Sequence, residues 1–211
     1  MSPGTAEEVA DPFAPFSGAA AILLGLASIV YAIFYLLVGQ RPGDFGRTAA
    51  AVTLAVGAFL GTAAYTGLYF RVCDVSHGFA LWGLALGIAH QALTLAGSVY
   101  QAFLGAAAQS SQTDPRGVAA FLLFGVASAV FGWLVVQEPQ LPRPLGYVGL
   151  VNALLLVLLF LGNATGSRAL ILAAGGLTSV IVTPLWWIWV GLQLRRPARG
   201  AQTEVAPQTS R

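Results

Sequence analysis

Long apolar runs separated by short polar stretches dominate the chain. A helix of about twenty residues, rising about 1.5 Å per residue, crosses the roughly 30 Å hydrocarbon core of a bilayer. The pattern predicts an all-α integral membrane bundle of six transmembrane helices, at residues 15–38, 48–70, 76–105, 115–136, 144–162 and 168–194. These helices form one domain, residues 15–194. A polar flexible tail (1–14) precedes it, and a disordered, arginine-containing tail (195–211) follows it.

The third run, Ser76–Gly105, carries both histidines of the protein. On a helical wheel, almost all of its small and hydrogen-bonding residues fall in one stripe that covers roughly a third of the circumference. Small residues let helices approach closely, and polar groups in hydrocarbon need partners, so this stripe is predicted to face the interior of the bundle. The stripe consists of Gly83, Gly87, His90, Thr94, Gly97, Ser98, Gln101 and Gly105.

His90 is the strongest candidate for a functional role. An ionisable residue near the bilayer midplane is costly, and burial is expected to keep its imidazole neutral. Two interpretations are open: a structural histidine hydrogen-bonded to a neighbouring helix, or a residue that contacts a ligand or handles protons. In the second interpretation, the candidate residues lining a ligand path are His90, Thr94, Gln101 and Asn152.

A second set of candidates lies near the helix ends on the side of the membrane that the two termini share. This candidate cytoplasmic-side cluster consists of Arg71, Asp74, His77, Trp82 and Arg143. Arg71 and Arg143 are suited to bind an anion. Alternatively, Arg71 forms an ion pair with Asp74, which also suits the N-cap of the third helix.

Metal and haem sites receive little support. Cys73, Asp74 and His77 resemble a zinc ligand set, but the capping role accounts for Asp74 and no metal site is predicted. His77 and His90 are thirteen residues apart, which is reminiscent of di-haem cytochromes b, yet the wheel puts them on different faces. Each haem would need a second axial ligand, whereas the chain has no third histidine and only one methionine, Met1. We predict no cofactor.

Composition narrows the class of protein. Apolar residues make up 57% of the chain and charged residues only 9%, compared with about 25% charged residues in soluble proteins. The net charge of +2 gives no reason to expect nucleic acid as a partner, and the single cysteine excludes an internal disulfide. No acidic residue lies within the six apolar runs, which argues against cation-driven transport.

Arginines and tryptophans predict the orientation. Five arginines (71, 143, 195, 196 and 199) lie near helix ends on the side shared by the termini, against four on the other side. The excess favours both termini in the cytoplasm, with the protein in a bacterial inner membrane. All five tryptophans fall toward the same side. They predict an aromatic belt at the interface or, alternatively, a ligand site lined by indoles.

Small residues and one proline predict how the helices pack. Gly57 and Gly61 form a small-xxx-small pair in the second helix, and Gly125 and Gly132 belong to a small face on the fourth. Pro184 is expected to kink the last helix, because proline lacks the amide hydrogen and crowds the preceding turn.

Two stretches carry a resemblance to a known family. LPRPLGYVGLVNALLLVLLFLG (141–162) and LTSVIVTPLWWIWVGLQLRR (177–196) resemble the C-terminal half of DUF4386-type bacterial membrane proteins. HGFALWGLALGIAHQAL (77–93) is similar to a run in related proteins. The family has no assigned activity, so the resemblance implies a bundle of six or seven spans and nothing catalytic.

Three functions remain open, and an interaction protein without chemistry of its own is favoured. In this hypothesis the partners are membrane lipids, with a protein partner or a homo-oligomer also considered. The alternative is a carrier or channel for a small uncharged or lipophilic solute. A membrane enzyme or redox subunit using His90 or His77 is the third. A polar cavity that reaches His90 from one side would favour the carrier or channel, and a closed, dry core would favour the interaction protein.

Overall fold

The computed structural model describes residues 12–34, 45–104 and 115–196, which form helices and short turns without a strand. The first five spans are α1 (Phe13–Ile33), α2 (Phe45–Val72), α3 (His77–Leu104), α4 (Pro115–Gln137) and α5 (Arg143–Thr165). The last span consists of α6 (Arg168–Leu177), the π-helical turn η3 (Thr178–Val182) and α7 (Thr183–Leu194). In this part of the chain, six helical spans are long and apolar enough to cross a membrane, which confirms the predicted fold class. The predicted tails fall almost entirely outside the described residues.

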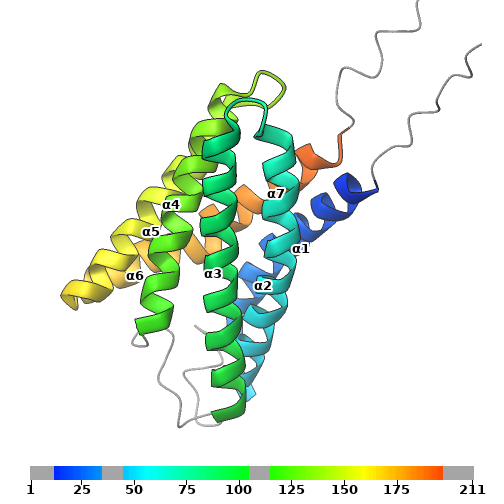
Figure 1. Ribbon diagram of the computed structural model, residues 1–211. Coiled ribbons are helices and arrows are strands. Elements are labelled where there is room, and N and C mark those ends of the chain that lie inside the picture. The colour runs from blue at the N-terminus through cyan, green and yellow to red at the C-terminus, as the bar shows by residue number, and fades with distance from the viewer. Residues whose placement is uncertain (1–11, 35–44, 105–114, 197–211) are drawn as a thin grey trace, which may run out of the picture.

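The six spans form a closed ring. Each span packs against its neighbours in the sequence, and the last span packs against α1 (Figure 1). We call the half of the bundle in which α1 begins and α7 ends the terminal half. The other half, in which α1 and α3 end and α4 begins, is the distal half. Because the ring is closed, side chains that turn inward meet other spans and not lipid.

Large apolar side chains cover the outside of this ring. Phe59 is 71% exposed, Leu154 60% and Leu172 62%, and all three belong to membrane-spanning helices. Polar side chains of the spans, such as His90 and Asn152, are buried instead. An apolar exterior, with the polar side chains of the spans turned inward, is what a bilayer requires. The chain is therefore a multi-pass integral membrane protein.

The predicted stripe of α3 faces the interior. Gly83, Gly87 and Ser98 are buried, whereas Leu95 and Phe103, on the other faces of the helix, are exposed. This orientation is confirmed for the whole stripe except Gly105, which lies outside the described residues. The reason is the one that the pattern indicated: only this face of α3 allows close approach and offers polar partners.

Glycines allow the closest helix contacts. An added Cβ atom at Gly191 of α7 would lie 2.5 Å from the carbonyl oxygen of Gly18 in α1. At Gly132 of α4, it would lie 3.0 Å from the carbonyl oxygen of Gly146 in α5, which confirms the predicted small face. Backbones this close leave no room for a side chain. The glycine contacts thus fix the α1–α7 and α4–α5 pairs.

The predicted pair in α2 is divided between two neighbours. An added Cβ atom at Gly57 would lie 3.5 Å from Leu24 of α1, whereas one at Gly61 would overlap the side-chain amide of Gln91 in α3. Gly57 thus leaves room for a side chain of α1, and Gly61 leaves room for a side chain of α3. The pair therefore does not form one continuous contact with a single helix.

Helix α5 is longer than predicted. It continues to Thr165 and ends at Gly166, whose φ of 69° lies in the left-handed region that glycine adopts readily. The amide of Gly166 donates to the carbonyl of Asn163 at 3.3 Å, and the amide of Ser167 donates to that of Gly162 at 2.8 Å. This is a Schellman motif. The turn predicted from residue 163 onward is thus the final turn of the helix and its C-cap.

The last span contains a π-helical turn next to its proline. Pro184 is the second residue of α7, and η3 directly precedes this helix. A π turn widens the helix by one residue and changes its hydrogen-bond register. Such a turn accommodates a proline, whose ring crowds the preceding turn and which offers no amide hydrogen. The sequence predicts a kink at Pro184, and the structure has the π-helical turn η3 directly before α7.

Gly191→Ala should lower the unfolding temperature of the purified protein in detergent, because the added methyl group overlaps the backbone of α1. Overpacking of this kind typically costs about 1–3 kcal/mol. Gly176→Ala is the matched control, since its Cβ would meet nothing within 4 Å. It should leave stability unchanged or raise it by about 0.5–1 kcal/mol. Circular dichroism against temperature measures both, and equal unfolding temperatures would contradict the α1–α7 contact.

Candidate ligand-binding cavity

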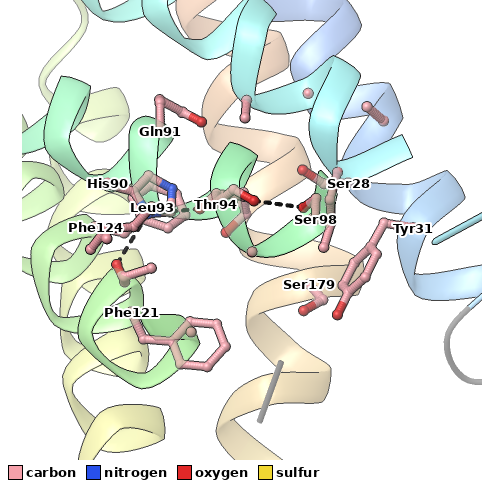
Figure 2. Close-up of a pocket in the computed structure, with 18 of the residues that line it drawn as sticks. Ser28, Tyr31, His90, Gln91, Leu93, Thr94, Ser98, Phe121, Phe124 and Ser179 are labelled. Atoms are coloured by element: carbon pink, nitrogen blue, oxygen red, sulfur yellow. Dashed lines mark hydrogen bonds between the residues drawn. The ribbon is translucent and has the colours of Figure 1, made fainter. Parts of the chain in front are cut away.

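The distal half of the bundle contains a partly open cavity of about 150 Å³, to which all six spans contribute. We call it the distal cavity. Figure 2 shows His90 of α3 beside Phe124 of α4, with Ser28 and Tyr31 of α1 across from them. No charged side chain lines the cavity among the described residues. Its polar lining residues are Ser28, Tyr31, Thr53, His90, Gln91, Thr94, Ser98, Gln101, Thr178, Ser179 and Thr183.

The cavity exists because small residues border the ring interior at this level. Gly97, Gly117 and Ala120 all lie in its wall. An added Cβ atom at Gly97 would meet nothing within 4 Å, so this position adjoins open space. Small side chains let helices pack closely in other parts of the bundle. At this level, the same small side chains leave a volume unfilled.

An aromatic layer closes the interior on the terminal side of the cavity. We define it as Tyr65, Phe131, Trp186 and Trp187, none of which is more than 1% exposed. The ring centroid of Tyr65 lies 4.9 Å from that of Trp187 and 5.7 Å from that of Phe131. Trp187 also lines the cavity. The layer therefore separates the cavity from the terminal half of the bundle.

The burial of two tryptophans corrects the predicted belt. Trp186 and Trp187 lie inside the ring, whereas Trp82 is 49% and Trp133 43% exposed. Trp82 and Trp133 are placed as interfacial anchors would be, and Trp189 is half-buried. The alternative of an indole-lined site fits Trp187, which borders the distal cavity. Position along the helix does not distinguish these cases, because the outcome depends on which face each indole occupies.

His90 is held against α4. Its Nδ1 atom lies 3.1 Å from the carbonyl oxygen of Ala120, and its ring stacks on Phe124 with centroids 4.6 Å apart and planes at 14°. The side chain is 9% exposed. In the structural interpretation, His90 therefore has a definite hydrogen-bond partner on the neighbouring helix, which is a backbone carbonyl. The same ring also lines the distal cavity, so the two interpretations do not exclude each other.

Several lining hydroxyls donate their protons within their own helix. Ser28 donates to the carbonyl of Leu24 at 3.1 Å, and Thr53 donates to that of Ala49 at 2.8 Å. Ser98 donates to the carbonyl of Thr94 at 2.6 Å. These hydroxyl oxygens keep lone pairs that can accept. The lining is thus richer in acceptors than its composition alone suggests.

Thr178 contributes a polar atom without a partner in the described structure. Its Oγ1 atom is buried and accepts or donates no hydrogen bond, and Thr178 is the first residue of η3. In a regular helix a threonine hydroxyl commonly bonds to a carbonyl one turn earlier. An unpaired polar group next to a cavity marks a position where a bound molecule would gain a contact.

Asn152 lies outside the lining of the distal cavity, in contrast to the ligand path predicted for it. It is fully buried, its Nδ2 atom donates to Ser128 Oγ at 3.2 Å, and its Oδ1 atom accepts from Thr183 Oγ1 at 2.7 Å. Asn152 thereby joins α4, α5 and α7. The predicted path residues His90, Thr94 and Gln101 do line the cavity. Their role in binding stays a prediction.

The predicted cluster of Arg71, Asp74, His77, Trp82 and Arg143 is not part of this cavity. Asp74, His77 and Arg143 are exposed, and His77 lies 3.4 Å from the hydroxyl of Tyr69. Arg71 is half-buried, and its Nε atom has no hydrogen-bond partner within the described residues. The same part of the chain contains no group of three histidine, cysteine or acidic side chains that could hold a metal ion.

Sequence reasoning missed the contributions of other helices to the cavity. Ser28, Tyr31, Thr53 and Ser179 line it from α1, α2 and η3. The available signal was a polar residue at a similar depth in several apolar runs. That signal does not show which faces of the helices meet.

No protein-family model, curated protein or solved structure matches the sequence. The resemblance to DUF4386-type proteins therefore stays a prediction, and functional conclusions rest on the geometry of the cavity.

Asn152→Leu should lower the unfolding temperature in detergent, because it removes two hydrogen bonds and leaves the hydroxyls of Ser128 and Thr183 without this partner. Interhelical hydrogen bonds in membrane proteins are worth about 0.6–1.7 kcal/mol each. Asn163→Leu is the control, since that amide donates only to the carbonyl of Leu159 in its own helix. An equally small effect of both substitutions would contradict the bridging role of Asn152.

Proposed function

We propose that the protein binds a small, uncharged, lipophilic molecule in the distal cavity. The observation that carries this proposal is a cavity inside the bundle that no charged side chain lines among the described residues. Its volume of about 150 Å³ equals that of an engineered apolar cavity that holds benzene. A ligand the size of one aromatic ring therefore fits. This function is a binding role without chemistry of its own.

The surface of the cavity supports a lipophilic ligand over a strongly polar one. Leu24, Leu93 and Phe121 are among its apolar lining residues, and several lining hydroxyls already donate to backbone carbonyls. A polyhydroxylated solute or an ion would lose its hydration without full replacement. An unpaired polar group in such surroundings costs about 1–3 kcal/mol by mutational measures. A mostly apolar molecule with few polar atoms avoids this cost.

A carrier is the second candidate, and one observation favours it. The distal cavity reaches His90 near the middle of α3, and the aromatic layer closes the other side. Alternating access requires a central site that is open to one side at a time. A carrier would have to open the aromatic layer during transport. Binding alone requires no such movement, which makes it the simpler function for this arrangement.

We infer that the protein lies in a bacterial inner membrane with the terminal half toward the cytoplasm. Among the described residues, the terminal ends of the helices carry Arg71, Arg143, Arg195 and Arg196. Arginine-rich helix ends favour the cytoplasmic side. In this orientation the distal cavity lies in the half of the bundle farther from the cytoplasm.

Gly97→Leu should weaken ligand binding because its side chain occupies part of the distal cavity. The added side chain enters open space, since its Cβ atom would meet nothing within 4 Å. The probe is para-fluoroanisole, an uncharged compound with a single aromatic ring. Fluorine NMR titration of the protein in lipid nanodiscs, corrected for empty nanodiscs, should show saturable binding that weakens at least about ten-fold in Gly97→Leu.

Gly176→Leu is the matched control for this experiment. Gly176 also adjoins open space but is not among the lining residues, so binding should be unchanged. Absence of saturable binding of both para-fluoroanisole and its hydroxyl analogue para-fluorophenol by the wild-type protein would overturn the proposed function. Equal binding by Gly97→Leu would place the ligand outside the cavity and would overturn the proposal as well.

Cysteine labelling tests the orientation. Cys73 is the only cysteine, so Cys73→Ser provides a background into which Asp74→Cys or Thr165→Cys is introduced. Both positions are exposed and lie at opposite ends of the bundle. In spheroplasts, a membrane-impermeant maleimide should label the cysteine at position 165 and reach the one at position 74 only after permeabilisation. The reverse pattern would contradict the inferred orientation.

A further inference from the structure

We infer that the ligand of the distal cavity carries a hydrogen-bond donor, which it gives to the Nε2 atom of His90. This inference rests on the proposed function and names its ligand class. The class is an uncharged, single-ring molecule with one hydroxyl or N–H group, of which a phenol is the simplest example. His90 is then the residue that determines specificity.

The first step concerns the proton on the histidine ring. Nδ1 lies 3.1 Å from the carbonyl oxygen of Ala120, and a carbonyl oxygen can only accept. Nδ1 therefore carries the hydrogen and donates it. The hydroxyl oxygen of Thr94, 3.4 Å from the same nitrogen, offers a second, weaker acceptor. In the neutral ring, Nε2 consequently has a lone pair and acts as an acceptor.

The second step concerns the surroundings of Nε2. Within the described residues, the hydrogen-bonding contacts of the His90 ring all involve Nδ1, and Phe124 covers one face. The ring also lines the distal cavity. The edge that carries Nε2 thus makes no hydrogen bond within the described residues, and we infer that it is the part of the ring that meets a molecule in the cavity. An acceptor in apolar surroundings gains most when a donor reaches it.

The third step concerns the rest of the lining. The hydroxyl protons of Ser28, Thr53 and Ser98 are donated to backbone carbonyls, so their oxygens present lone pairs. A ligand that offers a donor meets several acceptors. A ligand that offers only an acceptor cannot use these lone pairs, and the hydroxyl of Thr178 is the lining group already shown to be free to donate to it. These acceptors suit a ligand with a donor, and the ring-sized volume and the aromatic side chains of Phe121, Phe124 and Trp187 favour a flat molecule.

The test compares two probes of the same ring size, para-fluorophenol and para-fluoroanisole. The first has a hydroxyl donor, whereas the methyl ether of the second can only accept. Fluorine NMR titration in nanodiscs, corrected for empty nanodiscs, gives both dissociation constants. The wild-type protein should prefer the phenol by about ten-fold, the ratio that corresponds to one hydrogen bond.

Two variants assign this preference to His90. His90→Leu removes Nε2 and should equalise the two probes while para-fluoroanisole still binds. His90→Gln keeps an acceptor on a side chain of similar length and should retain the preference for the phenol. Size-exclusion chromatography shows whether each variant is folded. The wild-type comparison and His90→Gln suffice if His90→Leu does not fold.

The outcomes separate this inference from the proposed function. Saturable binding of both probes to the wild-type protein without a preference would overturn the donor inference and leave the binding function standing. A preference that persists unchanged in His90→Leu would assign it to another residue and overturn the role of His90. If neither probe binds saturably, the proposed function fails, and the inference fails with it.

Discussion

The closed ring depends on the contact between the first and the last span. Gly18 and Gly191 bring the backbones of α1 and α7 so close that a single methyl group would overlap. Without this contact, the inward faces of α1, η3 and α7 would meet lipid, and their polar groups would have no partners. With it, the protein gains an interior that is isolated from the acyl chains. The cavity, the aromatic layer and the bridge through Asn152 all lie in that interior.

The interior is divided into a filled part and a hollow part. Large aromatic rings fill it in the terminal half, where Tyr65 packs between Phe131 and Trp187. Small residues such as Gly97 and Ala120 border it in the distal half, where the cavity lies. His90 is positioned at the boundary by Ala120 and Phe124. The aromatic layer next to the distal cavity stabilises the bundle, and the cavity leaves room for a bound molecule.

Apolar run length and side-chain periodicity predicted the six spans and the inward face of α3, because both properties belong to a single helix. They did not predict the partner of Asn152 or the burial of Trp186, because these depend on how neighbouring helices are rotated and shifted. His90 could be singled out from its depth alone. The carbonyl of Ala120, thirty positions away, could not be assigned to it from the sequence. The cavity could not be predicted from the sequence either, because its shape depends on how all six spans pack together.

The π-helical turn has a consequence for how the last span tolerates change in length. A π turn contains about one residue more than a regular turn, so η3 accommodates an extra residue between α6 and α7. Loss of one residue from η3 would restore a regular helical turn and leave Trp186 and Trp187 facing Tyr65. A deletion in the regular turns of α6 or α7 would instead rotate the residues after it by about 100°. A single-codon deletion should therefore be tolerated better in η3 than in the helices on either side of it.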